Sequence, residues 1–105
     1  MLKTHLQAIE NLKAGKAGRV GRRDRVSVLE SIRLWEYHDS VIVQVNSGGI
    51  WVNWHGWFTV STTARIYALC DYLRISRIKK ADGSIKLIIN DKAVQDEFCG
   101  GTNET

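Results

Sequence analysis

The stretch "SIRLWEYHDSVIVQVNSGGIWVNW", residues 31–54, decides the fold class of this chain. It is rich in β-branched and aromatic residues, and its apolar residues recur with the two-residue period of a strand. The "NSGG" sequence at residues 46–49 is a strong turn signal between two such runs. The stretch therefore predicts two or three antiparallel strands.

A helix is expected on each side of these strands. Before them, apolar residues follow one another at helical steps and Gly15 ends the pattern. These residues are Leu2, Leu6, Ile9 and Leu12. After Gly56, "TVSTTARIYALCDYLRI" has a second set at helical spacing. These residues are Ile66, Leu69, Cys70 and Leu73.

The remainder of the chain completes an α+β domain. "ISRIKKADGSIKLIIN", residues 75–90, contains two alternating runs around "ADGS" and predicts a C-terminal hairpin. The order of elements predicts a small antiparallel sheet with an N-terminal helix and a second helix packed on one face. We expect one domain over residues 1–98 and a disordered tail over 99–105.

Size and charge bound the class of protein. With 105 residues and 44% hydrophobic content, the chain has material for one modest core, and a core this small predicts marginal stability or a homodimer. A net charge of +4 and a pI near 9.3 suit an anionic partner. Neither a signal segment nor an 18-residue apolar span is visible, so we expect a soluble, cytoplasmic protein.

No set of residues in the sequence amounts to a reaction centre. Cys70 and Cys99 lack the short spacing of a zinc site or redox pair, and His5, His38 and His55 are scattered. Phosphate-binding loops, nucleophile elbows and paired carboxylates are also absent from the sequence. We therefore expect no metal, no cofactor and no catalysis.

The segment "GKAGRVGRRDR", residues 15–25, predicts a flexible basic loop, because it combines glycines with arginines and offers little to bury. Its candidate nucleic-acid contacts are Lys16, Arg19, Arg22, Arg23 and Arg25. A second basic group would join the same positive surface if the fold brings the two together. That group consists of Arg74, Arg77, Lys79 and Lys80.

Alternation along the strands also predicts an aromatic binding face. Trp51 is out of phase with Ile50 and Val52, as Trp35 is with its aliphatic neighbours, so Trp35, Tyr37 and Trp51 share one face. If that face is exposed, its rings can stack on unpaired bases. The alternative is that the N-terminal helix covers it and the rings form a second small core.

The other two tryptophans, Trp54 and Trp57, flank His55 and Gly56 at the turn into the second helix. We expect them to fix the entry of that helix, with Trp57 in the core. The helix start itself could bind an external phosphate through Thr62, Thr63 and Arg65, because helix N-termini favour anions and no acidic residue stands nearby in the sequence. Ordinary capping by Thr59 or Ser61 is the alternative.

The run "RLWEYHDSVIVQVNSGGIWVNWHGWFTVSTTARIYAL", followed by "IKLIINDKAV", resembles a family of small uncharacterised proteins of tailed bacteriophages and related mobile elements. The family signature resembles Gly-Trp-x-Thr-x-Thr-Thr-x-Arg, and the spacing here departs from it around Phe58 and Ser61. The matching positions are Gly56, Trp57, Thr59, Ser61, Thr62, Thr63 and Arg65. The resemblance implies phage origin without an established activity.

Two functions follow as expectations from the charge, the aromatic face and this resemblance. The first is a phage accessory protein that binds nucleic acid, without catalysis, in the cytoplasm of an infected bacterium. The second is a stoichiometric inhibitor or modulator of a host protein complex, such as a defence system (for example CRISPR) or a polymerase, with the tryptophan surface as the contact.

Overall fold

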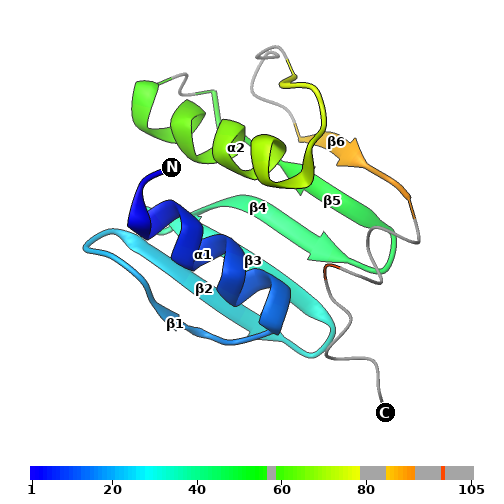
Figure 1. The fold of residues 1–105 in the computed structure, drawn as a ribbon. Helices are drawn as coiled ribbons and strands as arrows, with labels where there is room; N and C mark the ends of the chain where they lie inside the picture. Colours follow the sequence, from blue (N-terminus) through cyan, green and yellow to red (C-terminus); the bar gives the residue numbers. More distant parts are fainter. Residues whose placement is uncertain (57–58, 79–84, 92–97, 99–105) are drawn as a thin grey trace.

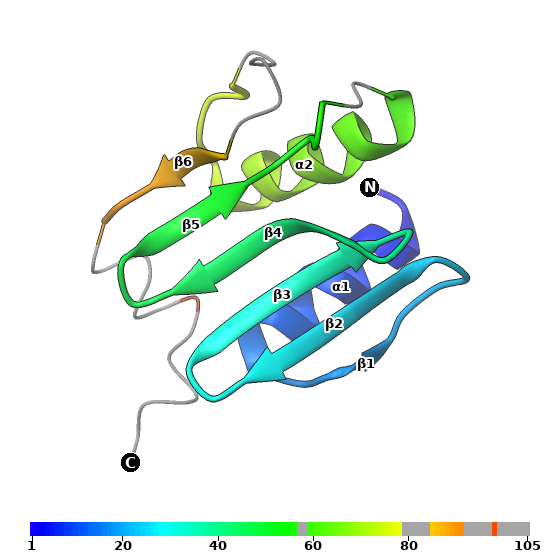
Figure 2. The same ribbon diagram turned by 180° about the vertical axis from the view of Figure 1, so that it is seen from behind.

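The chain folds as one antiparallel sheet with both helices on the same face (Figure 1), in a computed structural model that describes residues 1–56, 59–78, 85–91 and 98. The helices are α1, Lys3–Ala14, and α2, Val60–Leu73. The strands are β1, Gly18–Arg19; β2, Asp24–Leu29; β3, Ile32–Tyr37; β4, Ser40–Asn46; β5, Gly49–Val52; and β6, Lys86–Ile89. The predicted α+β class is confirmed, and Figure 2 shows the sheet face that neither helix covers.

Each strand pairs with its neighbour in sequence, so the sheet has the order β1-β2-β3-β4-β5-β6. The prediction of a loop over residues 15–25 is wrong in part, because the segment contains β1 and the first two residues of β2. Gly18 lies opposite Val26 and Arg19 opposite Arg25. Backbone pairing and the buried carboxylate of Asp24 order this segment, and a hydrophobic pattern reports neither contribution.

The predicted C-terminal hairpin is wrong in its first arm. Residues 75–78 form no strand, and residues 79–84 lie outside the described part of the chain. The second arm forms β6, which pairs antiparallel with β5. The apolar residues of β6 therefore extend the central sheet, where β5 already offers a free edge.

Helix α1 buries a face that is rotated from the predicted stripe. Ile9 and Leu12 are buried as expected, but Leu2 and Leu6 are exposed. The buried side includes Ala8 and His5, whose ring lies 6.2 Å from that of Trp35, centroid to centroid. Because Ala8 is small, α1 can approach the sheet closely at this residue. His5 is buried on the side where Leu2 and Leu6 were expected to lie.

The C-terminal end of α1 is fixed by its cap and by the sheet. Gly15 ends α1 in the left-handed conformation, as predicted, with φ of 69°. Arg33, buried on β3, donates from Nη1 to the carbonyl oxygens of Leu12 and Lys13, at 2.6 and 2.9 Å. The sheet thus satisfies the last carbonyls of α1 through a side chain that sequence reasoning did not single out.

The core lies between the helices and the sheet, and Trp35 is at its centre. The prediction that Trp35 is exposed is wrong: its exposed fraction is 0%. On β3 the helices cover the side of Arg33 and Trp35, so the aliphatic residues Ile32 and Leu34 lie on the open face. The alternative, in which the N-terminal helix covers the rings as a second small core, holds only in that Trp35 is covered, because Trp51 lies on the opposite face.

The remaining aromatic predictions have mixed outcomes. Trp51 faces away from the buried Ile50 and Val52 and is half-buried on the open face, as its phase predicted. Trp54 is buried, and its Nε1 donates to Thr63 Oγ1 at 3.0 Å, which ties the end of the sheet to α2 as expected. Trp57 lies outside the described residues. Cys70 is buried in α2.

Candidate nucleic-acid interface

Four arginines of the predicted basic segment meet at one end of the molecule. Arg19 comes from β1, Arg22 and Arg23 from the turn after it, and Arg25 from β2. They line a hollow of about 220 Å³ together with Glu36, His38 and Asp39. We call these four residues the arginine cluster. Lys16, the other predicted contact in this segment, is exposed just after the end of α1 and does not line the hollow.

Contacts within the hollow leave much of the positive charge accessible. Arg25 is bound to Glu36, with its Nε and Nη2 donating to Oε1 at 2.9 and 2.7 Å, and this carboxylate raises the pKa of Arg25. Arg23 Nη1 lies 3.1 Å from His38 Nδ1. Arg22 is exposed, and its side chain makes no hydrogen bond or ion pair within the described residues. Only part of the cluster is therefore neutralised internally.

Both helices begin at the same end of the molecule as the arginine cluster (Figure 1). Neither has an acidic residue in its first turn, so no carboxylate of either first turn offsets the positive end of the helix dipole, although the Thr59 side chain caps α2. The first turn of α1 touches the β1–β2 turn: a Cβ added at Gly21 would lie 2.8 Å from Thr4 Cγ2. The backbone field and the arginine charges therefore add at one end.

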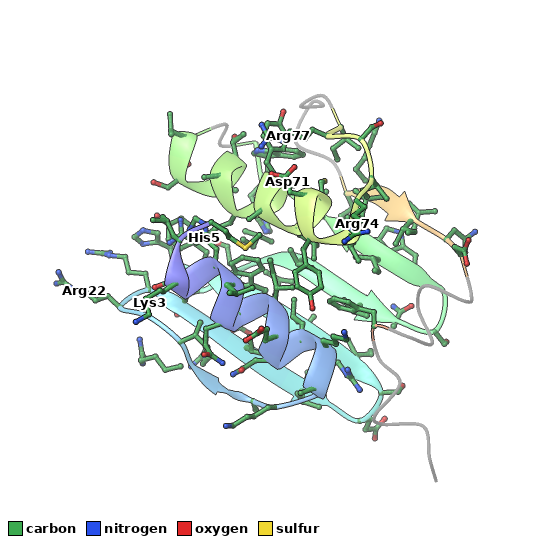
Figure 3. All side chains as sticks on the ribbon, viewed as in Figure 1. Lys3, His5, Arg22, Asp71, Arg74 and Arg77 are labelled. Carbon is green, nitrogen blue, oxygen red and sulfur yellow. The ribbon has the colours of Figure 1, made fainter. Side chains whose placement is uncertain are left out.

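The two described residues of the second basic group, Arg74 and Arg77, do not join this surface. Figure 3 shows Lys3 and Arg22 projecting from the cluster end, whereas Arg74 and Arg77 lie beside the C-terminal half of α2. Arg77 binds Asp71 there, with Nη2 2.7 Å from Oδ2. Lys79 and Lys80 lie outside the described residues.

Arg65 is held inside the fold instead of facing an external anion. Its Nε and Nη2 donate to the two carboxylate oxygens of Asp24 at 2.7 and 2.8 Å, and its guanidinium stacks 3.7 Å from the ring centre of Tyr37. Trp35 Nε1 donates to the same carboxylate at 2.9 Å. Burial alone would raise the pKa of Asp24, but the hydrogen bonds from Arg65 and Trp35 lower it below its ordinary value.

The hydroxyl groups at the start of α2 are also used internally. Thr59 is the N-cap, and its Oγ1 accepts from the Thr62 amide at 3.2 Å. Thr63 Oγ1 accepts from Trp54, as described above. The predicted capping by Thr59 is confirmed. The anion site at Thr62, Thr63 and Arg65 stays a prediction, and the contact between Thr59 and the Thr62 amide is the one that ordinary capping requires.

Of the three aromatic residues predicted for the interface, only Trp51 lies on the open face. Trp35 is buried and Tyr37 lies against Arg65, so neither presents a free ring on the open face. Trp51 lines a hollow of about 270 Å³ over β4 and β5. The other residues of that hollow are Val41, Ile42, Val43, Gln44, Asn46, Asn53, His55 and Ile85.

The arginine cluster and this hollow lie on the same face and are joined by one row of the sheet. Arg25 lies opposite Glu36 on β3, and Glu36 lies opposite Val41 on β4. Val41 in turn lines the Trp51 hollow. Sequence reasoning missed Gln44 and Asn53 at this place, although Asn53 follows Trp51 by two residues and Gln44 pairs with Trp51 across the predicted hairpin.

Comparison with family models, curated proteins and solved structures found no match to this chain. Within the described residues, no helix has the length and apolar content to cross a membrane. The same residues contain no group of three or more His, Cys, Asp or Glu side chains arranged to hold a metal ion.

Proposed function

We propose that this protein binds nucleic acid, without catalysis, by placing the arginine cluster against the phosphate backbone. The observation that carries the proposal is the meeting of Arg19, Arg22, Arg23 and Arg25 around one hollow. Arginine suits this role because its planar guanidinium donates two parallel hydrogen bonds to a phosphate. Phosphate contacts position a protein on nucleic acid and supply most of its non-specific affinity.

The surroundings of the cluster support an extended anion over a single small one. Two helix starts without acidic first turns lie at the same end, and Lys3 projects at the same end as Arg22 (Figure 3). Glu36 and Asp39 line the same hollow and reduce its net charge. Several separate positive groups around one hollow suit the repeated charge of a phosphate backbone.

The salt dependence of binding tests this function. We expect Arg22→Gln with Arg23→Gln to weaken binding of an oligonucleotide and to lower the slope of log affinity against log salt by about 1.4–1.8, from about 0.7–0.9 per lost phosphate contact. Both side chains are exposed, so the melting temperature should stay within a few degrees of the parent. Fluorescence anisotropy at several salt concentrations measures the slope.

The matched control carries the same loss of charge at the other end of the molecule. Lys13→Gln with Arg74→Gln removes two exposed cations outside the cluster. If this control lowers affinity and slope as much as the cluster variant, the binding reflects net charge alone and the proposed site is wrong.

A second candidate function is the modulation of a host protein, as the phage resemblance suggests. The observation in its favour is the set of apolar side chains exposed on or beside the open sheet face, including Leu29, Ile85 and Leu87 at 57%, 64% and 43%. An interface of this kind has little salt dependence, unlike binding to phosphates. Phage origin, action in an infected cell and formation of a homodimer stay predictions.

A further inference from the structure

We infer that the nucleic acid is single-stranded and that one unpaired base enters the Trp51 hollow. The inference rests on the proposed function, because the arginine cluster would hold the backbone that leads to this base. It adds a second site, the open face of β4 and β5, and it names the class of ligand, since a base inside a duplex does not offer its ring face to a side chain.

The lining of the hollow matches the chemistry of a base. Trp51 offers an indole, and Gln44 offers an amide donor and acceptor. Asn46 and Asn53 each accept through Oδ1 from the backbone amide two residues later, so they offer mainly their NH₂ donors. Apart from His55, the lining has no ionisable side chain, so it suits a neutral polar ring better than a phosphate. A volume of about 270 Å³ lies at the lower end of ligand sites, which suits one small planar group.

The sheet holds the aromatic ring in position. Trp51 lies directly opposite Gln44 on β4 and opposite Leu87 on β6. Glycines on the β4–β5 turn leave room for the indole: a Cβ added at Gly48 or Gly49 would lie 3.2 or 3.3 Å from Trp51 Cη2. The ring is therefore supported from its own hairpin, and little side-chain freedom remains to be lost on stacking.

The separation of the two sites fits a short strand of nucleic acid. Arg25 on β2 and Trp51 on β5 are three strand spacings apart, about 14 Å across the sheet. Trp51 pairs with Gln44, three residues from Val41, which adds about 10 Å along the strands. Small single-strand-binding domains cover about 4–16 nucleotides, so one strand can reach both sites. The row Arg25, Glu36 and Val41 lies between them and presents one carboxylate, which Arg25 already binds.

The experiment compares single strands with a duplex on the full chain. The probes are oligothymidylate and oligouridylate of about 12 nucleotides, within the site sizes of such domains, and a mixed-sequence duplex of the same length. We expect both single strands to bind more tightly than the duplex. Preference for oligothymidylate or oligouridylate then distinguishes DNA from RNA, and either preference supports the inference.

Variants of Trp51 test the base site directly. Trp51→Leu keeps an apolar side chain but removes the ring, and we expect it to weaken single-strand binding about tenfold, within the usual range for one lost base stack. Trp51→Phe should keep most of the affinity. Leu29→Gln is the control, because Leu29 is exposed on the same face outside the hollow. It should bind like the parent.

The outcomes separate this inference from the proposed function. Equal binding of single strands and duplex, with Trp51→Leu unchanged and the cluster variant still weakened, overturns the base site and leaves the arginine function standing. No binding of any oligonucleotide overturns both. Should Trp51→Leu prove unfolded by circular dichroism, Gln44→Ala and quenching of tryptophan fluorescence by the bound strand decide the question. An unchanged affinity together with unchanged fluorescence then overturns the base site.

Discussion

Asp24 links three elements of the fold: β2, on which it lies, β3 and α2. Its carboxylate is 2% exposed and accepts from Arg65 on α2 and from Trp35 on β3. Arg65 in turn covers the ring of Tyr37. A buried carboxylate with this set of donors is stable as a charged group, whereas its partners would be left unpaired without it.

Removing this carboxylate should be costly. We expect Asp24→Ala to lower the free energy of unfolding by about 3–5 kcal/mol, because it leaves the Arg65 charge and the Trp35 indole N–H without their acceptor. Urea unfolding measures the change. Glu10→Ala, an exposed change on α1, is the control and should stay within about 0.5 kcal/mol of the parent. A small effect for Asp24→Ala would show that water replaces the carboxylate readily.

His5 gives the fold a dependence on pH. Burial lowers the pKa of His5 below its ordinary value of 6.5, and the nearby Arg65 lowers it further. The unfolded chain therefore binds the proton more tightly than the folded chain does. The contribution of His5 is fully present above pH 6.5, and it falls as the pH drops from 6.5 toward the lower folded pKa.

Urea unfolding over a series of pH values checks this dependence. We expect the free energy of unfolding to decline below about pH 6.5 and the decline to be smaller in His5→Phe, whatever the absolute stability of that variant. His38→Gln, on an exposed turn, should keep the decline of the parent. An equal pH profile in His5→Phe would assign the decline to other groups.

At the scale of the elements, Trp35 is a core residue because α1 covers its side of the sheet. The helix lies over β2 and β3, and its His5 and Ile9 are buried on that side (Figure 1). Trp51 has no such cover, since both helices lie on the other face of the sheet (Figure 2). Two tryptophans of similar strand context thus have different roles because only one lies beneath a helix.

We expect the two tryptophans to differ in stability experiments. Trp35→Ala should cost about 3–5 kcal/mol through the cavity it leaves, and the domain will then be at the limit of folding. Trp51→Ala should cost clearly less, because part of its ring is already in water. Thermal unfolding gives the comparison, with Trp35→Phe as a milder variant. Equal losses at the two positions would contradict the difference in burial.

The sequence predicted elements well and their faces less well. The apolar residues in 31–54 and 60–73 recur with the periods of a strand and a helix, which depend on local conformation alone. These ranges form the expected strands and helix. The prediction of which side of β3 faces the core was wrong, because the aliphatic residues of this strand were assumed to lie on the core side. Ile32 and Leu34 face outward instead, while Arg33 and Trp35 find polar partners under α1. Such partners are remote in sequence and leave no local signal.

At the scale of the whole molecule, the directions in which the helices and strands run determine which basic side chains lie together. Both helices begin at one end, and the β1–β2 and β3–β4 turns lie at that end too (Figures 1 and 2). The cluster of Arg19, Arg22, Arg23 and Arg25 could be anticipated from composition. Its separation from Arg74 and Arg77 could not, because the sequence does not specify which ends of the elements meet.

The order of the strands also bears on how quickly the chain can fold. Each strand pairs with the next one along the chain, so much of the sheet forms from contacts of small sequence separation. Such a topology folds faster than a sheet whose neighbouring strands are remote in sequence. The 105-residue chain also has no proline, so slow prolyl isomerisation cannot delay its refolding. Hairpins from β1 through β4 can pair as they leave the ribosome, before the residues of α2 have emerged from it.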